Sequence, residues 1–226
     1  MTWSGLRRAL PWAIALACLS AGSGASNAAR NTPGAFDYYA LVLTWMPSYC
    51  RGEGRSRKDG QCDIAKPHAF LLHGLWPQHE KGWPEDCPTG NRPWVPESVI
   101  AEMRDIMPSK NLVIHEYRAH GTCSGLDPAQ YFAVARALYQ RISVPARFLA
   151  ADAKPLASPA EIERAFLDAN PWLKPDMISV TCRRAHLLDI RVCFGRDLFP
   201  RACGINEDQR RLCAAPKITV PAPAPH

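Results

Sequence analysis

Short apolar runs that stop at prolines dominate the first third of the chain. Residues 36–50, FDYYALVLTWMPSYC, predict a β-strand that runs into a turn at Pro47. Residues 68–77, HAFLLHGLWP, predict a second strand with a proline stop. The charged, glycine-rich segment at residues 51–61 predicts a loop between the two strands.

The middle of the chain changes to a helical period. Four segments carry apolar residues at helical spacing after a proline-rich loop: residues 97–108, 112–121, 127–142 and 158–171. Asp127 and Ser158 each precede a proline and a capping-box partner, which indicates two well-defined helix starts. Pro108 and Gly121 are the expected stops of the first two helices.

The β pattern returns near the carboxyl end. Residues 177–182 and 187–195 predict strands, and in the second of these the apolar positions alternate with Asp189 and Arg191. Strands at both ends with helices between them predict an α+β domain, with a central, largely antiparallel β-sheet and flanking helices. The last residues, 221–226, PAPAPH, are expected to form a loose tail.

The first 28 residues read as a cleaved export signal. They combine a basic start, an apolar stretch too short to span a bilayer and small residues for a peptidase, which we expect to cut after Ala28, with Ala25 as the competing position. Lipid attachment at Cys18 is a weaker alternative, because Ala15 stands where a lipoprotein box has leucine. The mature domain is then residues 29–226, without a linker or internal repeat.

The net charge and the cysteine content of residues 29–226 indicate the kind of partner and the compartment of the exported domain. The loss of Arg7 and Arg8, with no acid, lowers the formal net charge from +6 to +4, which suits a polyanionic partner without proving one. Eight cysteines remain without any CxxC spacing, and their even number predicts disulfides and a periplasmic or secreted location. The charged loop is expected to close through Cys50 and Cys62.

Two segments contain candidate chemistry. His73 lies inside an apolar run, where a lone histidine is more often a core residue than a catalyst. HEYRAHGTC, residues 115–123, does not fit a zinc protease, because His115 and His120 are five residues apart, about 140° round an α-helix. Glu116 and His120 share a face, so the carboxylate can orient the imidazole, although each also suits a surface or helix-end charge.

The two segments together carry a resemblance. FLLHGLWP and HEYRAHGTC, in an exported chain with eight remaining cysteines, resemble the active-site segments of the RNase T2 family of secreted, acid-type ribonucleases. LVLTWMPSYC, residues 41–50, is similar to the first strand of that family, and the last four cysteines match its C-terminal pattern. The resemblance covers nearly the whole mature chain and implies a single T2-like domain.

The resemblance implies roles for five residues. His120 would be the general base and His73 the general acid, while His115 binds the phosphate and Glu116 balances charge around the pentacoordinate phosphorus. Trp76 would stack on a nucleobase, with core packing as an equal alternative. The reaction needs no metal or other cofactor and leaves a 2′,3′-cyclic phosphate that is then hydrolysed.

The resemblance also implies a disulfide framework. Cys87 would join the loop after the first histidine segment to Cys123 in the second. The C-terminal cysteines would form two nested bridges, and Cys50 with Cys62 is then left by elimination. The C-terminal pairs are Cys182–Cys213 and Cys193–Cys203.

One position departs from the family pattern. Ala119 stands where the family has a lysine immediately before the second histidine. Losing such a group commonly lowers the rate by about 10²- to 10³-fold. We expect Arg118, or a basic residue of the loop after Cys50, to supply the charge, although Arg118 points roughly 100° away from position 119 on an α-helix.

The sequence therefore predicts a monomeric, exported endoribonuclease that acts on RNA and not on DNA, with no membrane contact after the leader is removed. An RNA-binding or toxin-like module with weakened chemistry is the alternative that Ala119 leaves open. A metallohydrolase would differ from both, because a chelator would abolish its activity.

Overall fold

The structure is a computed structural model. Beyond Met1 it describes residues 31–52, 60–62, 68–149 and 156–223. The expected leader and most of the charged loop lie outside the described residues, as do residues 224–226.

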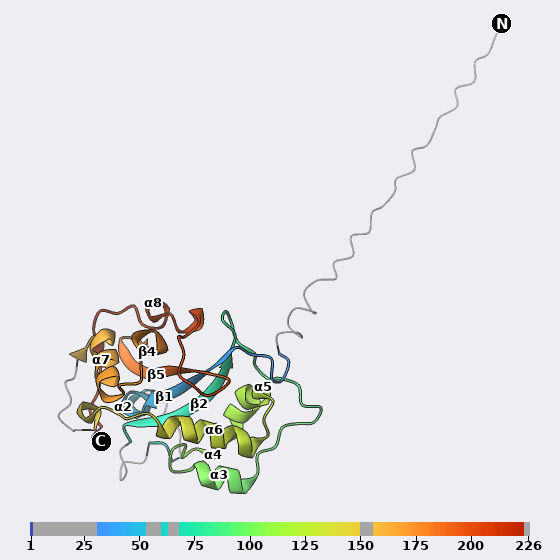
Figure 1. Ribbon diagram of the computed structural model, residues 1–226, viewed down its shortest axis with the longest axis horizontal. Helices are drawn as coiled ribbons and strands as arrows, with labels where there is room; N and C mark the ends of the chain where they lie inside the picture. Colours follow the sequence, from blue (N-terminus) through green and yellow to red (C-terminus); the bar gives the residue numbers. More distant parts are fainter. Residues whose placement is uncertain (2–30, 53–59, 63–67, 150–155, 224–226) are drawn as a thin grey trace.

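A mixed sheet forms the centre of the molecule (Figure 1). Its hydrogen-bonded order is β2 (Phe70–Gln78), β1 (Tyr38–Trp45), β5 (His186–Gly195), β6 (Ile218–Thr219) and β3 (Leu156–Ala157), and β4 (Ile178–Arg183) also pairs with β5. The pairs are antiparallel except for the short parallel contact of β5 with β6. The α+β prediction with a largely antiparallel sheet is confirmed, and the two-residue strands β3 and β6 carry no sequence pattern that would reveal them.

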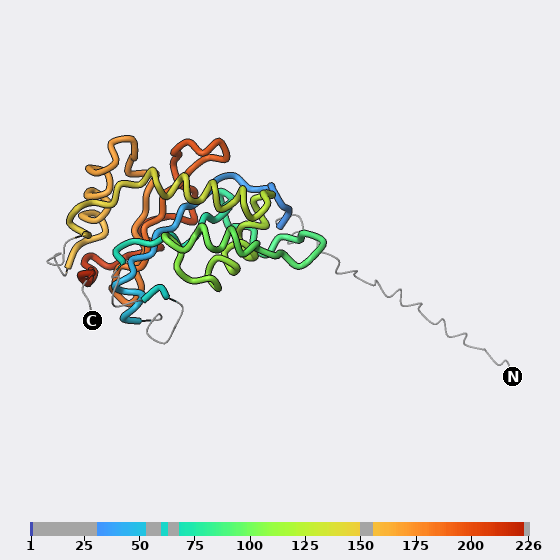
Figure 2. Tube along the Cα trace, turned by 90° about the horizontal axis from the view of Figure 1, so that it is seen from below, coloured from blue at the N-terminus to red at the C-terminus, as the bar shows by residue number. Residues whose placement is uncertain are grey.

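Helices pack around this sheet in two groups. Figures 1 and 2 show the green and yellow helices beside β2, and α7 with α8 near β4. The first group is α3 (Glu97–Met103), α4 (Lys110–Glu116), α5 (Thr122–Ser124) and α6 (Pro128–Gln140). The second group is α7 (Pro159–Ala169) and α8 (Gln209–Leu212). The short helix α2 (Met46–Arg51) belongs to neither group. Within the described residues, no helix is both long and apolar enough to cross a bilayer.

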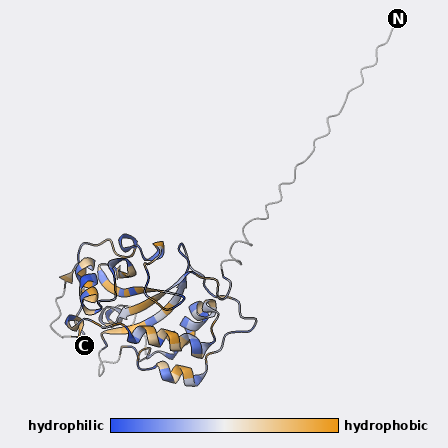
Figure 3. Cartoon of the chain, in the orientation of Figure 1, coloured by the Kyte–Doolittle hydropathy of each residue, from blue (hydrophilic) through white to orange (hydrophobic). Residues whose placement is uncertain are grey.

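The core lies between the sheet and these helices, where the apolar faces in Figure 3 meet. Trp45, Phe70, Phe148 and Phe166 form an aromatic cluster with ring centroids 4.7 to 5.7 Å apart. Such rings bury large apolar areas, so they anchor the ends of β1 and β2. Strand β2, which carries His73 and Trp76, and its neighbour β1 are therefore rigid supports.

The capped helices begin where the sequence places them. Asp127 and Ser158 accept hydrogen bonds from the backbone N–H of Gln130 and Glu161, and the side chains of these partners bond back to complete both capping boxes. Such caps are worth about 1 kcal/mol each. They fix the first turns of α6 and α7.

Three element boundaries differ from the sequence predictions. Pro47 lies in the first turn of α2, where its missing N–H costs nothing, instead of in a simple turn. Helix α3 ends at Met103, well before Pro108. The second predicted helix does not stop at Gly121. It continues through a π-helical turn to Ser124 and is capped by Gly125, whose positive φ of 78° suits glycine.

Four disulfides cross-link the fold. They join Cys50–Cys62, Cys87–Cys123, Cys182–Cys213 and Cys193–Cys203, the same pairs that the resemblance implies. The second links the loop after β2 to α5 and so connects the two histidine segments.

The start of the proline-rich tail is packed. Pro221 is buried, and its carbonyl accepts a 3.1 Å hydrogen bond from the indole Nε1 of the buried Trp45. A loose tail can therefore begin no earlier than residue 222.

Candidate active site

A β-bulge explains why His73 faces a cleft from within an apolar strand. In the pairing of β1 with β2, Val42 lies opposite Gly74 and Leu43 opposite Leu72, so His73 is the extra residue. A bulge redirects side chains and disturbs the strict alternation of faces. His73 and Trp76, three residues apart, thereby come together with ring centroids 5.3 Å apart.

Polar groups from three elements surround the His73 ring. Its Nδ1 is 3.1 Å from Thr44 Oγ1 and 3.8 Å from Asp189 Oδ1. Its Nε2 lies 3.6 Å from Oε1 of Glu116. The Thr44 hydroxyl donates a 2.7 Å hydrogen bond to Asp189, so the threonine holds that carboxylate beside the ring.

These carboxylates favour the imidazolium form of His73. Burial works against the charge, but the Asp189 carboxylate and the negative charge of Glu116 outweigh burial, and together they raise the pKa of His73 to about 9. At neutral pH the His73 ring therefore carries its proton.

The second histidine segment contains a π-helical turn. After α4 the chain forms the turn Tyr117–Gly121 and then continues as α5. A π turn pairs residues five apart, and such turns are frequent at functional sites. The α-helical angle between His115 and His120 that the sequence analysis assumes therefore does not apply, because the extra residue brings positions i and i+5 toward the same side.

Glu116 is the buried centre of the cluster. Its side chain is 1% exposed, and its Oε2 accepts a 2.8 Å hydrogen bond from Trp76 Nε1. Burial raises the pKa of the Glu116 carboxyl, while the charge of His73 and the bond from Trp76 oppose that shift. The alternative that Glu116 is a surface charge is excluded by this burial.

Gly74 makes the approach of Glu116 possible. A Cβ at this position would lie 2.0 Å from Glu116 Oε2 and 2.7 Å from Trp76 Nε1. Real Cβ atoms essentially never come that close, so only glycine fits between the two bonded groups. The close packing of Glu116 against β2 thus explains the glycine after His73.

His120 has the opposite environment to His73. Its ring lies 5.0 Å from the Trp76 ring, with the planes 30° apart. Burial lowers the pKa of His120, and neighbouring cations lower it further, to about 3; these are His115, His73 and Arg191. Its Nδ1 is buried and has no hydrogen-bond partner among the described residues.

Arg191 is a site residue that the sequence analysis missed. Its Cζ lies 4.9 Å from the Trp76 ring centroid, and its Nη1 is 3.5 Å from Oε1 of the buried Glu207. Its Nε is buried and has no partner within the described part of the chain. The sequence does show that Asp189 and Arg191 alternate with apolar residues along a strand. Only the pairing of β5 with β1 shows that this strand lies next to the one before the first histidine segment.

Arg118, the first sequence candidate for the missing charge, is bonded outside this cluster. Arg118 donates a 3.1 Å hydrogen bond from Nε to the Pro93 carbonyl, and Ala119 is 3% exposed, with its carbonyl bonded to the Asp86 N–H. The structure thus does not bring Arg118 to the histidines. The loop after Cys50 was the other expected source of charge. Its Arg51 is exposed at the end of α2, and residues 53–59 lie outside the described residues.

A cavity of about 440 Å³ opens over this cluster. Six of its lining side chains belong to the groups described above, namely Thr44, His73, Trp76, His115, Asp189 and Arg191. His120 is not among the lining residues, but its ring packs against the ring of Trp76, which does line the cavity. In the described residues, no group of three or more histidine, cysteine or acidic side chains is arranged to hold a metal ion.

Known proteins share this sequence and fold. The model of the Ribonuclease T2 family matches residues 36–203. A ribonuclease of Aeromonas hydrophila is 37% identical over 119 residues, covering 53% of this chain and 52% of the relative. Ribonuclease I of Escherichia coli (strain K12) is 28% identical over 208 residues, covering 73% of this chain and 77% of the relative.

A solved structure is similar throughout the domain. The RNase-related protein from Calystegia sepium has a TM-score of 0.65 at 20% identity, covering 82% of this chain and 97% of the other. The chain spans about half the length of the Aeromonas relative. Since the family model covers well over half of the chain, including both histidine segments, the chain belongs to the Ribonuclease T2 family.

Proposed function

We propose that this protein is an endoribonuclease that cleaves single-stranded RNA without a metal, by transesterification through a 2′,3′-cyclic phosphate to 3′-phosphate ends. The observation that carries the proposal is the pair of histidines with opposite pKa shifts around Trp76. The His73 pKa is raised to about 9 and the His120 pKa is lowered to about 3. Pairs of titratable groups pushed apart in this way suit acid and base roles.

In the first step, neutral His120 accepts the proton of the ribose 2′-hydroxyl as its oxygen attacks the adjacent phosphorus. Protonated His73 donates a proton to the departing 5′-oxygen, and the bond from phosphorus to that oxygen breaks. Each transfer of this kind contributes roughly 10²- to 10⁴-fold to the rate. The products are a 2′,3′-cyclic phosphate and a free 5′-hydroxyl.

The second step reverses the proton movements. His73, now neutral, accepts a proton from a water molecule that attacks the cyclic phosphate. His120, now protonated, returns its proton to the 2′-oxygen, which leaves a 3′-phosphate. Both histidines recover their starting states, so the cycle balances.

Three further residues complete the charge arrangement. His115 lines the cleft and is proposed to bind the phosphate, and Glu116 holds the ring of Trp76 while balancing the charge of His73. Arg191 is proposed to supply the positive charge that Ala119 lacks, because its guanidinium lies at the cleft and its buried Nε–H has no partner among the residues that the structure describes. Arg118 does not fit this role, since it is bonded to Pro93.

Thr44 and Asp189 are proposed as positioning residues for the acid. The Thr44 hydroxyl fixes the Asp189 carboxylate at 2.7 Å, and both groups lie beside His73 Nδ1. A carboxylate that faces one ring nitrogen orients the imidazole and leaves the other nitrogen to handle the proton.

Trp76 is proposed to contribute a surface for a nucleobase. The ring lines the cleft, is partly exposed and contacts both His120 and Arg191. Stacking on an aromatic face tolerates any base, which suits a broad preference. Core packing alone does not explain its place on the cleft wall.

RNA is the proposed partner, and the protein is proposed to act as a monomer outside the cytoplasm, in the periplasm or the medium. Four disulfides support that compartment, because such bridges persist in oxidising surroundings.

The proposed function is tested by incubating the protein with RNA and with DNA of matched sequence in excess EDTA. We expect cleavage of RNA only, with cyclic or 3′-phosphate ends, because the mechanism needs the 2′-hydroxyl. RNA that stays intact from acidic to neutral pH would support the RNA-binding module instead. Loss of cleavage on chelation would indicate a metallohydrolase.

A further inference from the structure

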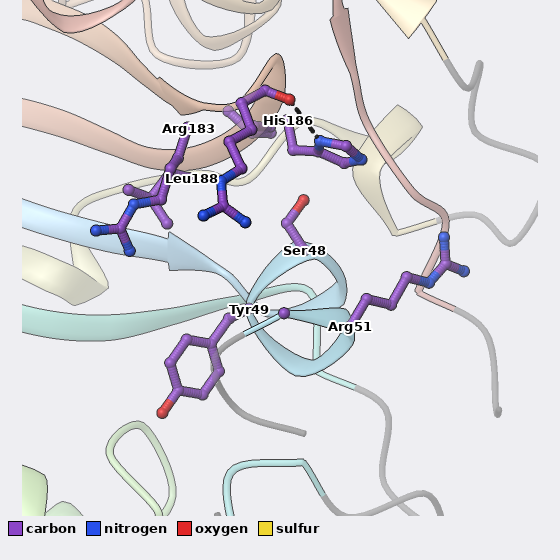
Figure 4. Close-up of a pocket in the computed structure, with 9 residues that line it drawn as sticks. Ser48, Tyr49, Arg51, Arg183, His186 and Leu188 are labelled. Carbon is purple, nitrogen blue, oxygen red and sulfur yellow. Dashed lines mark hydrogen bonds between the residues drawn. The ribbon is translucent and has the colours of Figure 1, made fainter. Parts of the chain in front are cut away.

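A second cavity, of about 620 Å³, lies between α2 and the β4–β5 hairpin (Figure 4). Its lining includes four basic side chains, Arg51, Arg183, Arg184 and His186. All four are exposed, and no acidic residue is among the described residues that line the cavity. Figure 4 shows Arg51 and Arg183 at opposite sides, with Ser48 pointing toward the side of His186.

The hairpin wall of this cavity is held in place. Arg184 and Ala185 both have positive φ, 48° and 57°, as a two-residue hairpin turn requires, although asparagine and glycine are the usual residues there. The Ala185 carbonyl accepts a 2.7 Å hydrogen bond from the Thr219 N–H, and His186 Nδ1 lies 2.9 Å from the Arg184 carbonyl oxygen. The arginines at the turn therefore stand on a fixed backbone.

Disulfides anchor both walls. Cys50–Cys62 fixes the end of α2, and Cys182–Cys213 fixes the end of β4 just before the turn. Opposite the hairpin, the hydroxyl of Ser48 is buried and has no hydrogen-bond partner in the described part of the chain. A buried hydroxyl without a partner needs an explanation, and a polar ligand group in this cavity would supply one.

The basic cavity is continuous with the active-site cleft. Tyr49, Arg183 and Leu188 line both cavities. Along β5, His186 precedes Asp189 by three residues, which is about 10 Å of strand. A polyanion held over His73 can therefore extend from the cleft into the basic cavity.

We propose that the basic cavity binds the phosphodiester groups of an RNA strand beyond the cleaved bond, so that this enzyme prefers long RNA over dinucleotides. The inference rests on the proposed function and extends it. Arginine forks match phosphate oxygens in a bidentate way, and their contacts carry no base preference. The four basic side chains therefore select the length of the strand and not its sequence.

The test uses binding of a 2′-O-methyl RNA decamer, which cannot be cleaved because its 2′-oxygen carries no proton. We compare the wild-type protein with the double variant Arg51→Ala/Arg184→Ala, whose residues line the basic cavity only. Since exposed charge contacts contribute a factor of a few each, we expect the variant to bind the decamer about tenfold more weakly. The slope of log Kd against log salt should also fall, by roughly 0.7 for each lost phosphate contact.

The matched control is Arg104→Ala/Arg164→Ala, which removes the same charge from exposed positions that line neither cavity. The control should bind the decamer like the wild type. If both double variants weaken binding equally, net charge explains the effect and the proposed subsite is wrong. A double variant Arg51→Ala/Arg184→Ala with unchanged affinity and salt slope would overturn it as well.

Cleavage assays separate this inference from the proposed function. In the wild type, kcat/KM for a decamer of unmodified RNA should exceed that for a dinucleotide, and Arg51→Ala/Arg184→Ala should lower this ratio about tenfold. Cleavage of neither substrate by the wild type would refute the proposed function. Cleavage of both with a ratio that the variant does not change would refute the basic subsite alone.

Discussion

The site has a strand wall that carries His73 and a helix wall that carries His120 against Trp76, and the charges around the two rings have opposite signs. On the strand wall, Asp189 and Glu116 surround His73 and raise its pKa to about 9. On the helix wall, burial and nearby cations lower the pKa of His120 to about 3. The difference teaches that a histidine side chain can carry a proton in either role. Neighbours from distant segments shift its pKa and so decide whether it begins the reaction as an acid or as a base.

The largest expected effect comes from removing either histidine. His73→Ala or His120→Ala should lower kcat/KM for RNA by about 10⁴-fold, the upper part of the range for a general acid or base. The measurement is steady-state cleavage of a defined oligoribonucleotide, and His79→Ala, at a histidine that lines neither cavity, is the control. Undiminished cleavage after both histidines are replaced would end the mechanism.

The next effect tests the cation at the junction of the two walls. Arg191→Ala should lower kcat by about 10²-fold, because a positive charge near the developing phosphorane charge is lost. Arg191→Lys keeps the charge and should recover part of the rate. A kcat for Arg191→Ala within about twofold of the wild type would exclude Arg191 as the replacement for the missing lysine.

The strand wall alone is altered by Asp189→Asn. The substitution removes a group that raises the His73 pKa, so the alkaline limb of the pH–rate profile should move from about 9 to lower pH, by about one unit or more. The sign follows because the acid must be protonated, and a lower pKa loses the proton earlier as pH rises. The acid limb, which reports the protonation of His120, should stay within a few tenths of a unit, and an unmoved alkaline limb would contradict the assignment.

The smallest effect is expected at Arg118. Since its guanidinium is bonded to the Pro93 carbonyl, Arg118→Ala should change kcat less than about twofold, like other surface substitutions. Ala119→Lys should not raise kcat either, because the side chain of Ala119 is buried and faces away from solvent. A tenfold loss in Arg118→Ala would return the role of surrogate cation to this residue.

Local patterns were enough for much of the fold. The capping boxes at Asp127 and Ser158 and the alternation in β5 predict real elements, because these signals depend on neighbours in sequence. The boundaries of α3 and of the helix around Gly121 were wrong, because packing and a π turn decided them. Strands as short as β3 exist only through their partners and leave no pattern of their own.

In the candidate site, too, some residues could be identified from sequence and others only from the fold. The two histidine segments could be found from sequence because a family resemblance names them. Asp189, Thr44 and Arg191 could not be assigned, because a strand's alternation gives two faces and only pairing with β1 shows that one of them meets the cleft. Arg118 stood out as a candidate for the charge because a helix position does not reveal a backbone partner such as the Pro93 carbonyl.

The opposite protonation of the two rings is tested most directly by NMR titration of the histidine imidazoles in the free protein, with His73→Gln and His120→Gln spectra used to assign the signals. We expect the ring of His73 to titrate near pH 9 and the ring of His120 to remain neutral until about pH 3. Two rings that both titrate near their ordinary value of about 6.5 would contradict the account.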